Sequence, residues 1–186
     1  MILTAALKEW AIAVDALSQG KTILLLRKGG IRETGGTFTV PYRQVWLYPT
    51  YEHQKPHLLK PEYGDRVSEV PSGWHPETVA IQSWAEITHT LPVQESGAVE
   101  KLLPFHVWNE QFVTERLNWK PKTPLYLLLL RVYRLPEPVQ IPYRDAYGGC
   151  RSWIELETEL ETEGAIALLS DQEYEAQVQE ILECGK

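Results

Sequence analysis

Cysteine is scarce in this chain, and long apolar runs are missing. Only Cys150 and Cys184 occur in 186 residues, which is too few for a disulfide framework and lacks the paired spacing of a zinc site. The longest apolar run, Leu125 to Leu130, is far shorter than the roughly 20 residues of a membrane-spanning helix. The first residues also lack the pattern of a signal peptide. We therefore expect a cytoplasmic protein with no membrane span.

The sequence also lacks the motifs of several large enzyme classes. It contains no Gly-x-Ser-x-Gly elbow, no Walker motif, no His-Glu-x-x-His and no dinucleotide-binding fingerprint. Each of these motifs places specific groups around a nucleophile, a phosphate or a metal. Their absence argues against those chemistries. We identify no set of metal ligands in the sequence, and the identity of any cofactor stays open.

The overall composition is that of an ordinary globular protein, with 44% hydrophobic and 23% charged residues. This length suits one domain spanning residues 1–186. The net charge of −7 is unevenly distributed, because residues 152–186 hold 10 Asp and Glu against 1 Lys. We therefore expect an acidic C-terminal segment, residues 155–186, on a body that is close to neutral.

Three helices are predicted from apolar residues at helical spacing. The first covers residues 4–18, with Lys8 and Glu9 on the solvent side. The second lies within residues 99–118 and starts near Pro104. The third covers residues 170–182 and begins with Ser170 and Glu173 in the spacing of a capping box.

Short apolar segments between turn residues predict strands. The acids that alternate from Glu155 to Glu163 form either the exposed face of an edge strand or a solvated loop. Prolines mark residues 49–76 and 136–147 as loops. The expected fold is α+β, a mainly antiparallel sheet on which an N-terminal, a central and a C-terminal helix pack. The predicted strands are residues 21–28, 37–40, 45–48, 78–84 and 125–135.

Several longer strings resemble a known family. Leu-Leu-Arg-Lys-Gly-Gly-Ile (25–31), Tyr-Pro-Thr-Tyr-Glu-His-Gln (48–54), Leu-Leu-Arg-Val-Tyr-Arg-Leu (129–135) and Gly-Gly-Cys-Arg-Ser-Trp (148–153) are similar to a DUF1802-like bacterial family, common in photosynthetic bacteria. That family is a domain of unknown function. The resemblance therefore implies no activity, cofactor or catalytic residue.

A second resemblance is to the RNA-associated ASCH domains, whose signature places Gly, Lys, Glu and Arg along a helix-to-strand junction. Gly20 and Arg27 have the separation of that signature. Lys21 lies one place early, and Leu25 stands where the family has Glu. The polar pair that this resemblance would imply is therefore interrupted.

The segment Arg27, Lys28, Gly29, Gly30 combines two cations at a strand end with a backbone that an anion can approach closely. These residues lie in a basic stretch, residues 19–60, and Arg151 lies in a second basic stretch, residues 116–151. If the two stretches meet in space, these residues would bind a phosphate-bearing ligand. The alternative is a hairpin turn whose charges are simply solvated.

Two further segments carry groups that could act chemically. Glu52 and His53 could exchange protons near neutral pH or bind a metal, unless they are part of a hydrogen-bonded structural loop. Cys150 beside Arg151 could be an activated thiol, although a buried position under Trp153 is the more ordinary expectation. Trp108 and Trp119 could stack on bases or lie in the core.

Three functional hypotheses follow. The first is a binding or processing module for nucleic acid or a nucleotide, with Arg27, Lys28, Gly29, Gly30 and Arg151 as contacts. The second is a hydrolase or nuclease-like enzyme that uses Glu52 and His53. The third is a protein-interaction module whose acidic segment binds a basic partner.

Overall fold

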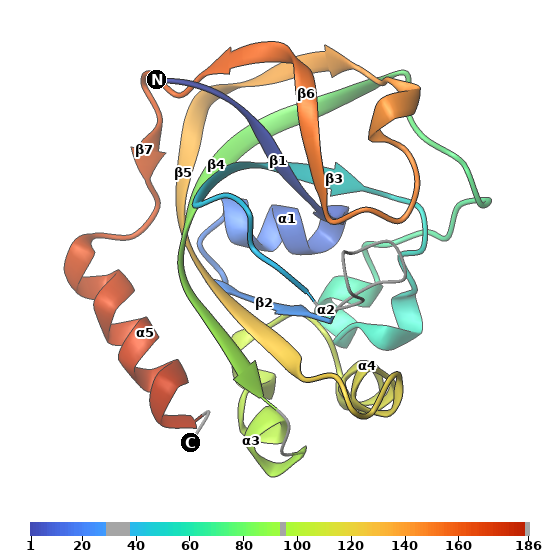
Figure 1. Ribbon diagram of the computed structural model, residues 1–186, viewed down its shortest axis with the longest axis vertical. Coiled ribbons are helices and arrows are strands. Elements are labelled where there is room, and N and C mark those ends of the chain that lie inside the picture. The colour runs from blue at the N-terminus through green and yellow to red at the C-terminus, as the bar shows by residue number, and fades with distance from the viewer. Residues whose placement is uncertain (29–37, 94–95, 185–186) are drawn as a thin grey trace.

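The computed structural model describes residues 1–28, 38–93 and 96–184 and has the predicted α+β fold (Figure 1). Its sheet is mixed but mostly antiparallel, in the order β2-β5-β4-β3-β1-β6, with β7 paired to β5. The only parallel pairing among the described strands joins β1 to β3. The strands are β1 (Ile2–Trp10), β2 (Leu24–Arg27), β3 (Gln44–Thr50), β4 (Thr78–Val93), β5 (Leu125–Pro142), β6 (Trp153–Glu161) and β7 (Ile166–Ala167).

Helices pack at three places on this sheet. In Figure 1, α1 lies inside the curve of the sheet, α3 and α4 lie near one end of β4 and β5, and α5 runs along the outside below β7. None of the helices in the described part is long and apolar enough to cross a membrane. They are α1 (Ala11–Ser18), α2 (Pro61–Gly64), α3 (Ser96–Lys101), α4 (Glu110–Asn118) and α5 (Asp171–Cys184).

The C-terminal helix and the acidic edge strand follow the predictions. The Ser170 backbone N–H donates to the Glu173 carboxylate at 2.8 Å, which is the predicted capping box. β6 ends the sheet, and its residues alternate between buried and exposed positions. The acids from Glu155 to Glu161 therefore lie on an edge strand, where charge discourages pairing with another chain.

The predicted helix over residues 4–18 is wrong in its first half. Residues 2–10 form β1, and only residues 11–18 are helical. β1 pairs with a strand on each side, and both of its faces are covered: Ala5 and Leu7 pack in one core cluster, Ala6 in another. Burial on both faces removes the alternation that identifies a strand, so the apolar residues matched a helical spacing by accident.

The start predicted for the central helix, near Pro104, is wrong. α3 ends at Lys101, a short 3-10 helix (Leu103–Phe105) follows, and α4 begins only at Glu110. Asn109 has an extended backbone, and its side chain accepts a hydrogen bond from the Phe112 N–H at 3.1 Å. This N-cap starts a new helix.

The two longest strands extend beyond their predicted bounds. β4 and β5 pair from Thr78 and Pro142 at one end to Val93 and Leu125 at the other. The prediction of a loop over residues 136–142 is therefore wrong. Within the described part, no strand pairs with the other side of β5 beyond Arg134, so the missing N–H groups of the prolines cost little there.

One predicted strand is absent. Residues 38–40 belong to no strand, and residue 37 lies outside the described residues. The apolar side chain of Phe38 is nevertheless buried. It packs on Trp153, with ring centroids 5.9 Å apart.

Candidate functional site

A groove lies between α4 and the segment that follows β3. The segment is held in place by Gln54, whose buried side chain accepts a hydrogen bond from the Ile12 N–H of α1 at 2.9 Å. Asn109, at the start of α4, donates to the carbonyl oxygens of His57 at 2.7 Å and Leu59 at 3.2 Å. These bonds fix the separation of the two walls.

The groove has a volume of about 460 Å³, which is within the usual range of about 300–1,000 Å³ for ligand sites. Its apolar base is made by Trp10 and Phe112, whose rings meet edge to face at 5.7 Å. Trp119, at the end of α4, is 37% exposed. The lining residues are Trp10, His53, Lys55, Leu58, Phe112, Glu115, Arg116 and Trp119.

Arg116 is the cation at the centre of this lining. Its guanidinium lies over Phe112, at 5.0 Å from the ring centroid, and near Trp119, at 5.9 Å. Burial lowers its pKa; nearby Arg27 adds to this effect, whereas Glu9 and Glu115 oppose it. Within the described residues, no carboxylate forms an ion pair with it. Because Arg116 is only partly buried, its guanidinium donors can be reached by an anion from the groove.

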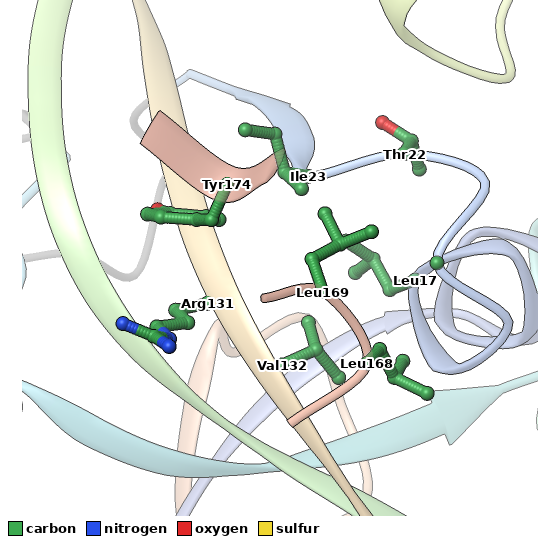
Figure 2. Close-up of a pocket in the computed structure, with 9 residues that line it drawn as sticks. Leu17, Thr22, Ile23, Arg131, Val132, Leu168, Leu169 and Tyr174 are labelled. Carbon is green, nitrogen blue, oxygen red and sulfur yellow. The ribbon is translucent and has the colours of Figure 1, made fainter. Parts of the chain in front are cut away.

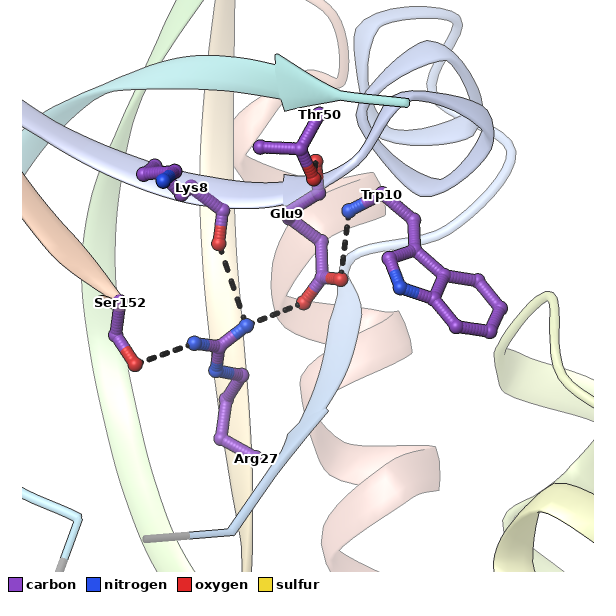
Figure 3. A network of polar contacts seen from close by, with 6 residues as sticks. All are labelled: Lys8, Glu9, Trp10, Arg27, Thr50 and Ser152. Carbon is purple, nitrogen blue, oxygen red and sulfur yellow. Dashed lines mark hydrogen bonds and ion pairs between the residues drawn. The ribbon is translucent and has the colours of Figure 1, made fainter. Parts of the chain in front are cut away.

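Arg27, a predicted ligand contact, is held by the protein itself. Its guanidinium donates to the Glu9 carboxylate at 2.8 Å, to the Ser152 hydroxyl at 2.6 Å and to the Lys8 carbonyl at 3.3 Å (Figure 3). The Glu9 carboxylate also accepts from the Trp10 N–H at 2.8 Å. Glu9 is 6% exposed, so its predicted place on a solvent-facing helix side is wrong.

Lys28, the second predicted contact, closes the end of α4. Its ammonium donates to the carbonyl oxygens of Arg116 at 2.6 Å and Leu117 at 3.1 Å. The last carbonyls of a helix lack partners within the helix, and a cation is favourable there. Burial lowers the pKa of Lys28, and Arg116 lowers it further.

The two basic stretches do meet in space, because Arg27 contacts Ser152, the neighbour of Arg151. Arg151 itself is exposed, and its guanidinium donates to the Ala146 carbonyl at 2.7 Å. Gly29 and Gly30, the remaining members of the predicted ligand set, lie outside the described residues.

Glu52 and His53, the predicted catalytic pair, lie at the edge of the groove. The His53 ring is 3.2 Å from the Glu52 carboxylate and lines the groove. The carboxylate accepts from the Gly73 N–H at 2.7 Å and the Ser72 hydroxyl at 3.0 Å, and these bonds lower the pKa of Glu52. His53 has a φ of 68°, a conformation that non-glycine residues adopt mostly at constrained sites.

Lys8 is a titratable group that the sequence did not single out. Its ammonium donates to the carbonyl oxygens of Tyr147 at 2.5 Å and Gly149 at 2.7 Å, so it ties β1 to the turn before β6. Burial lowers its pKa to about 8; Arg151 adds to this effect, while Cys150 and Glu52 oppose it. Because residues 4–18 were expected to be helical, Lys8 was expected in solvent.

The predicted burial of Cys150 under Trp153 is wrong. Cys150 is a free, exposed cysteine, and Cys184 is also free. Trp153 instead packs on Phe38 and Tyr42. Its indole N–H donates to the Thr39 carbonyl at 2.9 Å.

A second cavity, between α1, β5 and the segment after β7, is too small for a ligand. Figure 2 shows Leu17, Val132, Leu168 and Leu169 pointing toward one another across it. Its volume of about 10 Å³ is roughly that needed by one water. In the part of the chain that the structure describes, no cluster of His, Cys, Asp and Glu is arranged to hold a metal.

A family model described as a domain of unknown function (DUF1802) matches residues 6–180. The chain belongs to the DUF1802 family. No curated protein matches this DUF1802 chain.

The chain is also similar to solved structures from Zymomonas mobilis. One is ASCH from that organism, at 14% identity and a TM-score of 0.49, covering 94% of this chain and 93% of the other. Another is a point mutant of the same protein, at 12% identity and a TM-score of 0.49, covering 94% and 96%.

Removing one partner of the buried Glu9–Arg27 pair should lower the stability of the protein more than removing one partner of an exposed ion pair. Arg27→Met leaves the buried Glu9 carboxylate without its cation, so we expect the free energy of unfolding to fall by about 3–5 kcal/mol. Adding Glu9→Gln removes the uncompensated charge, keeps an acceptor for the Trp10 N–H and should recover much of that loss. Urea denaturation of the two single variants and the double variant measures this coupling.

Arg43 provides the matched control, because its side chain is 79% exposed and it pairs with Glu86. Arg43→Met should cost less than about 1 kcal/mol. Additive effects of Glu9→Gln and Arg27→Met would contradict the assigned coupling.

Lys8 should make stability depend on pH in the alkaline range. Its pKa is about 8 in the folded protein and 10.5 in its ordinary state, so the unfolded chain binds more protons between these values and stability must rise with pH there. The cost of burying the charged amine is fully present below pH 8. We expect the free energy of unfolding of the wild type, relative to Lys8→Met, to rise from about pH 8 to about pH 10.5. The exposed Lys21, changed to Met, is the control, and a difference independent of pH would refute the assignment.

Proposed function

We propose that this DUF1802 protein binds a phosphate-bearing ligand with flat rings, a nucleic acid or a nucleotide, in the groove beside α4. The observation that carries the proposal is the half-buried Arg116 guanidinium, which lies against two aromatic rings and forms no ion pair with a carboxylate among the described residues. Arginine pairs well with phosphate because its planar donors match the phosphate oxygens.

The charge behind the groove supports an anionic occupant. Arg27 and Lys28 both lie close to Arg116. The charge of Arg27 lowers the pKa of Arg116, and the charge of Arg116 lowers the pKa of Lys28. Glu9 faces them, but its carboxylate is already bonded to Arg27. In this proposal Arg27 and Lys28 do not contact the ligand directly. The charge of Arg27 is balanced by Glu9, and Lys28 contributes positive potential near Arg116.

The rings of the groove support stacking. Trp119 is partly exposed, and the cation of Lys120 lies 4.9 Å from its ring centroid. Aromatic rings interleaved with cations are typical of surfaces that bind single-stranded nucleic acid. Because the whole chain carries a net charge of −7, the attraction is local to the groove.

A second candidate function, a hydrolase or nuclease-like activity, uses the same groove. His53 lines it, is next to the Glu52 carboxylate and has a left-handed backbone. An imidazole in this position can accept or donate a proton beside a bound phosphate. Such an activity would show as shortening of a labelled oligonucleotide during a binding experiment.

Fluorescence anisotropy with labelled single-stranded RNA and DNA tests the proposed binding. We expect the wild type to bind more weakly as salt rises, because phosphate contacts release counterions. Arg116→Gln should weaken binding by about 10- to 100-fold, the effect of losing a charge-assisted hydrogen bond.

Arg43→Gln makes the same change in net charge at an exposed arginine that is already paired with Glu86. It should leave the affinity nearly unchanged. The proposal fails if the wild type binds neither RNA nor DNA at low salt, or if the two substitutions weaken binding equally.

A further inference from the structure

Two pairs of aromatic side chains lie where the loop that contains His53 begins and ends. The Tyr51 and Trp74 rings meet edge to face at 5.8 Å. His75 stacks on Tyr143, with ring centroids 3.4 Å apart and an interplanar angle of 10°. We call Tyr51, Trp74, His75 and Tyr143 the loop platform. Trp74 is 44% exposed, so part of its ring is accessible to a ligand.

The loop platform is joined to the groove by a continuous series of contacts. His53 lines the groove and lies 3.2 Å from the Glu52 carboxylate. That carboxylate accepts hydrogen bonds from Ser72 and Gly73, the residues directly before Trp74. Glu52 therefore holds the two ends of the loop together, so that Trp74 lies beyond the His53 edge of the groove.

The Glu52 carboxylate accepts hydrogen bonds from two protein donors and lies 3.2 Å from the His53 ring. The bonds from Gly73 and Ser72 lower its pKa and keep it charged, so a bound strand must hold its phosphates away from Glu52. The exposed Arg151, in the segment between Tyr143 and β6, adds positive charge.

We infer that the groove and the loop platform form one surface for a single strand of several nucleotides, with one base on Trp119 and another on Trp74. This inference rests on the proposed function and narrows it from a nucleotide or nucleic acid to a single-stranded oligonucleotide. A duplex does not fit the arrangement, because its bases are already stacked on one another and cannot lie on protein rings.

The test compares a labelled dinucleotide with a labelled octanucleotide of the same base, in RNA and DNA forms, using wild type, Trp119→Ala, Trp74→Ala and Trp74→Phe. The wild type should bind the octanucleotide at least about tenfold more tightly than the dinucleotide, because one stacked base contributes that much or more. Trp74→Ala should remove most of this gain and leave dinucleotide binding unchanged. Trp119→Ala should weaken the binding of both.

Trp74→Phe keeps a ring on the platform and should retain much of the gain. The exposure of Trp74 means that its removal should leave thermal unfolding nearly unchanged, which is measured in parallel. A longer oligonucleotide also offers more ways to occupy the groove, but Trp74→Ala does not alter that statistical advantage.

The outcomes separate the two claims. An octanucleotide affinity that Trp74→Ala leaves unchanged overturns the loop platform, while weaker dinucleotide binding by Trp119→Ala would still support the groove. If the wild type binds neither length, the proposed function fails, and this inference fails with it.

Discussion

Glu9 carries the one carboxylate that is buried in the described part of the chain, and Arg27 reaches it from the end of β2. The same guanidinium bonds to Ser152 beside β6 and to the Lys8 carbonyl of β1. Three strand ends that are distant in sequence are therefore joined through a single ion pair. Removing one partner of a buried ion pair strongly destabilises a protein. This contact therefore fixes the positions of the three strand ends relative to one another.

The groove follows from how the neighbouring cations are used. The Arg27 guanidinium is bonded to the Glu9 carboxylate, and the Lys28 ammonium is bonded to the last carbonyls of α4. α4 is thereby fixed at its C-terminal end, as Asn109 fixes its start. Arg116 is then left half-buried beside Phe112 and Trp119 and forms no ion pair among the described residues, although Glu9 and Glu115 are near enough to raise its pKa. The packing of the fold thus leaves a guanidinium that an anionic ligand would meet in the proposed function.

Local patterns in the sequence predicted the elements that depend on local physics. The capping box at Ser170 and the apolar first half of β5 gave correct assignments, and the alternating acids of β6 form the edge strand that was one of their two predicted alternatives. β1 was missed because burial on both faces leaves no periodicity to detect. Burial also hid the roles of Lys8 and Glu9.

The same difference between local patterns and long-range packing applies to the candidate site. Arg27 and Lys28 were correctly placed at a strand end, but sequence cannot show that Glu9 and the end of α4 already engage them. The spacing of Phe112, Arg116 and Trp119 on one helix was available from the sequence. The contribution of Trp10 from β1 was not, because it depends on long-range packing.

The indole N–H signals of the seven tryptophans test the account most directly, through a two-dimensional NMR titration with a single-stranded octanucleotide. We expect the signals of Trp10, Trp74 and Trp119 to shift in proportion to binding, while those of the other four tryptophans stay nearly fixed. Shifts confined to Trp153, beside Arg27 and Arg151, would place the ligand elsewhere. That result, or no shift at all, would contradict the central claim that the groove beside α4 is the binding site.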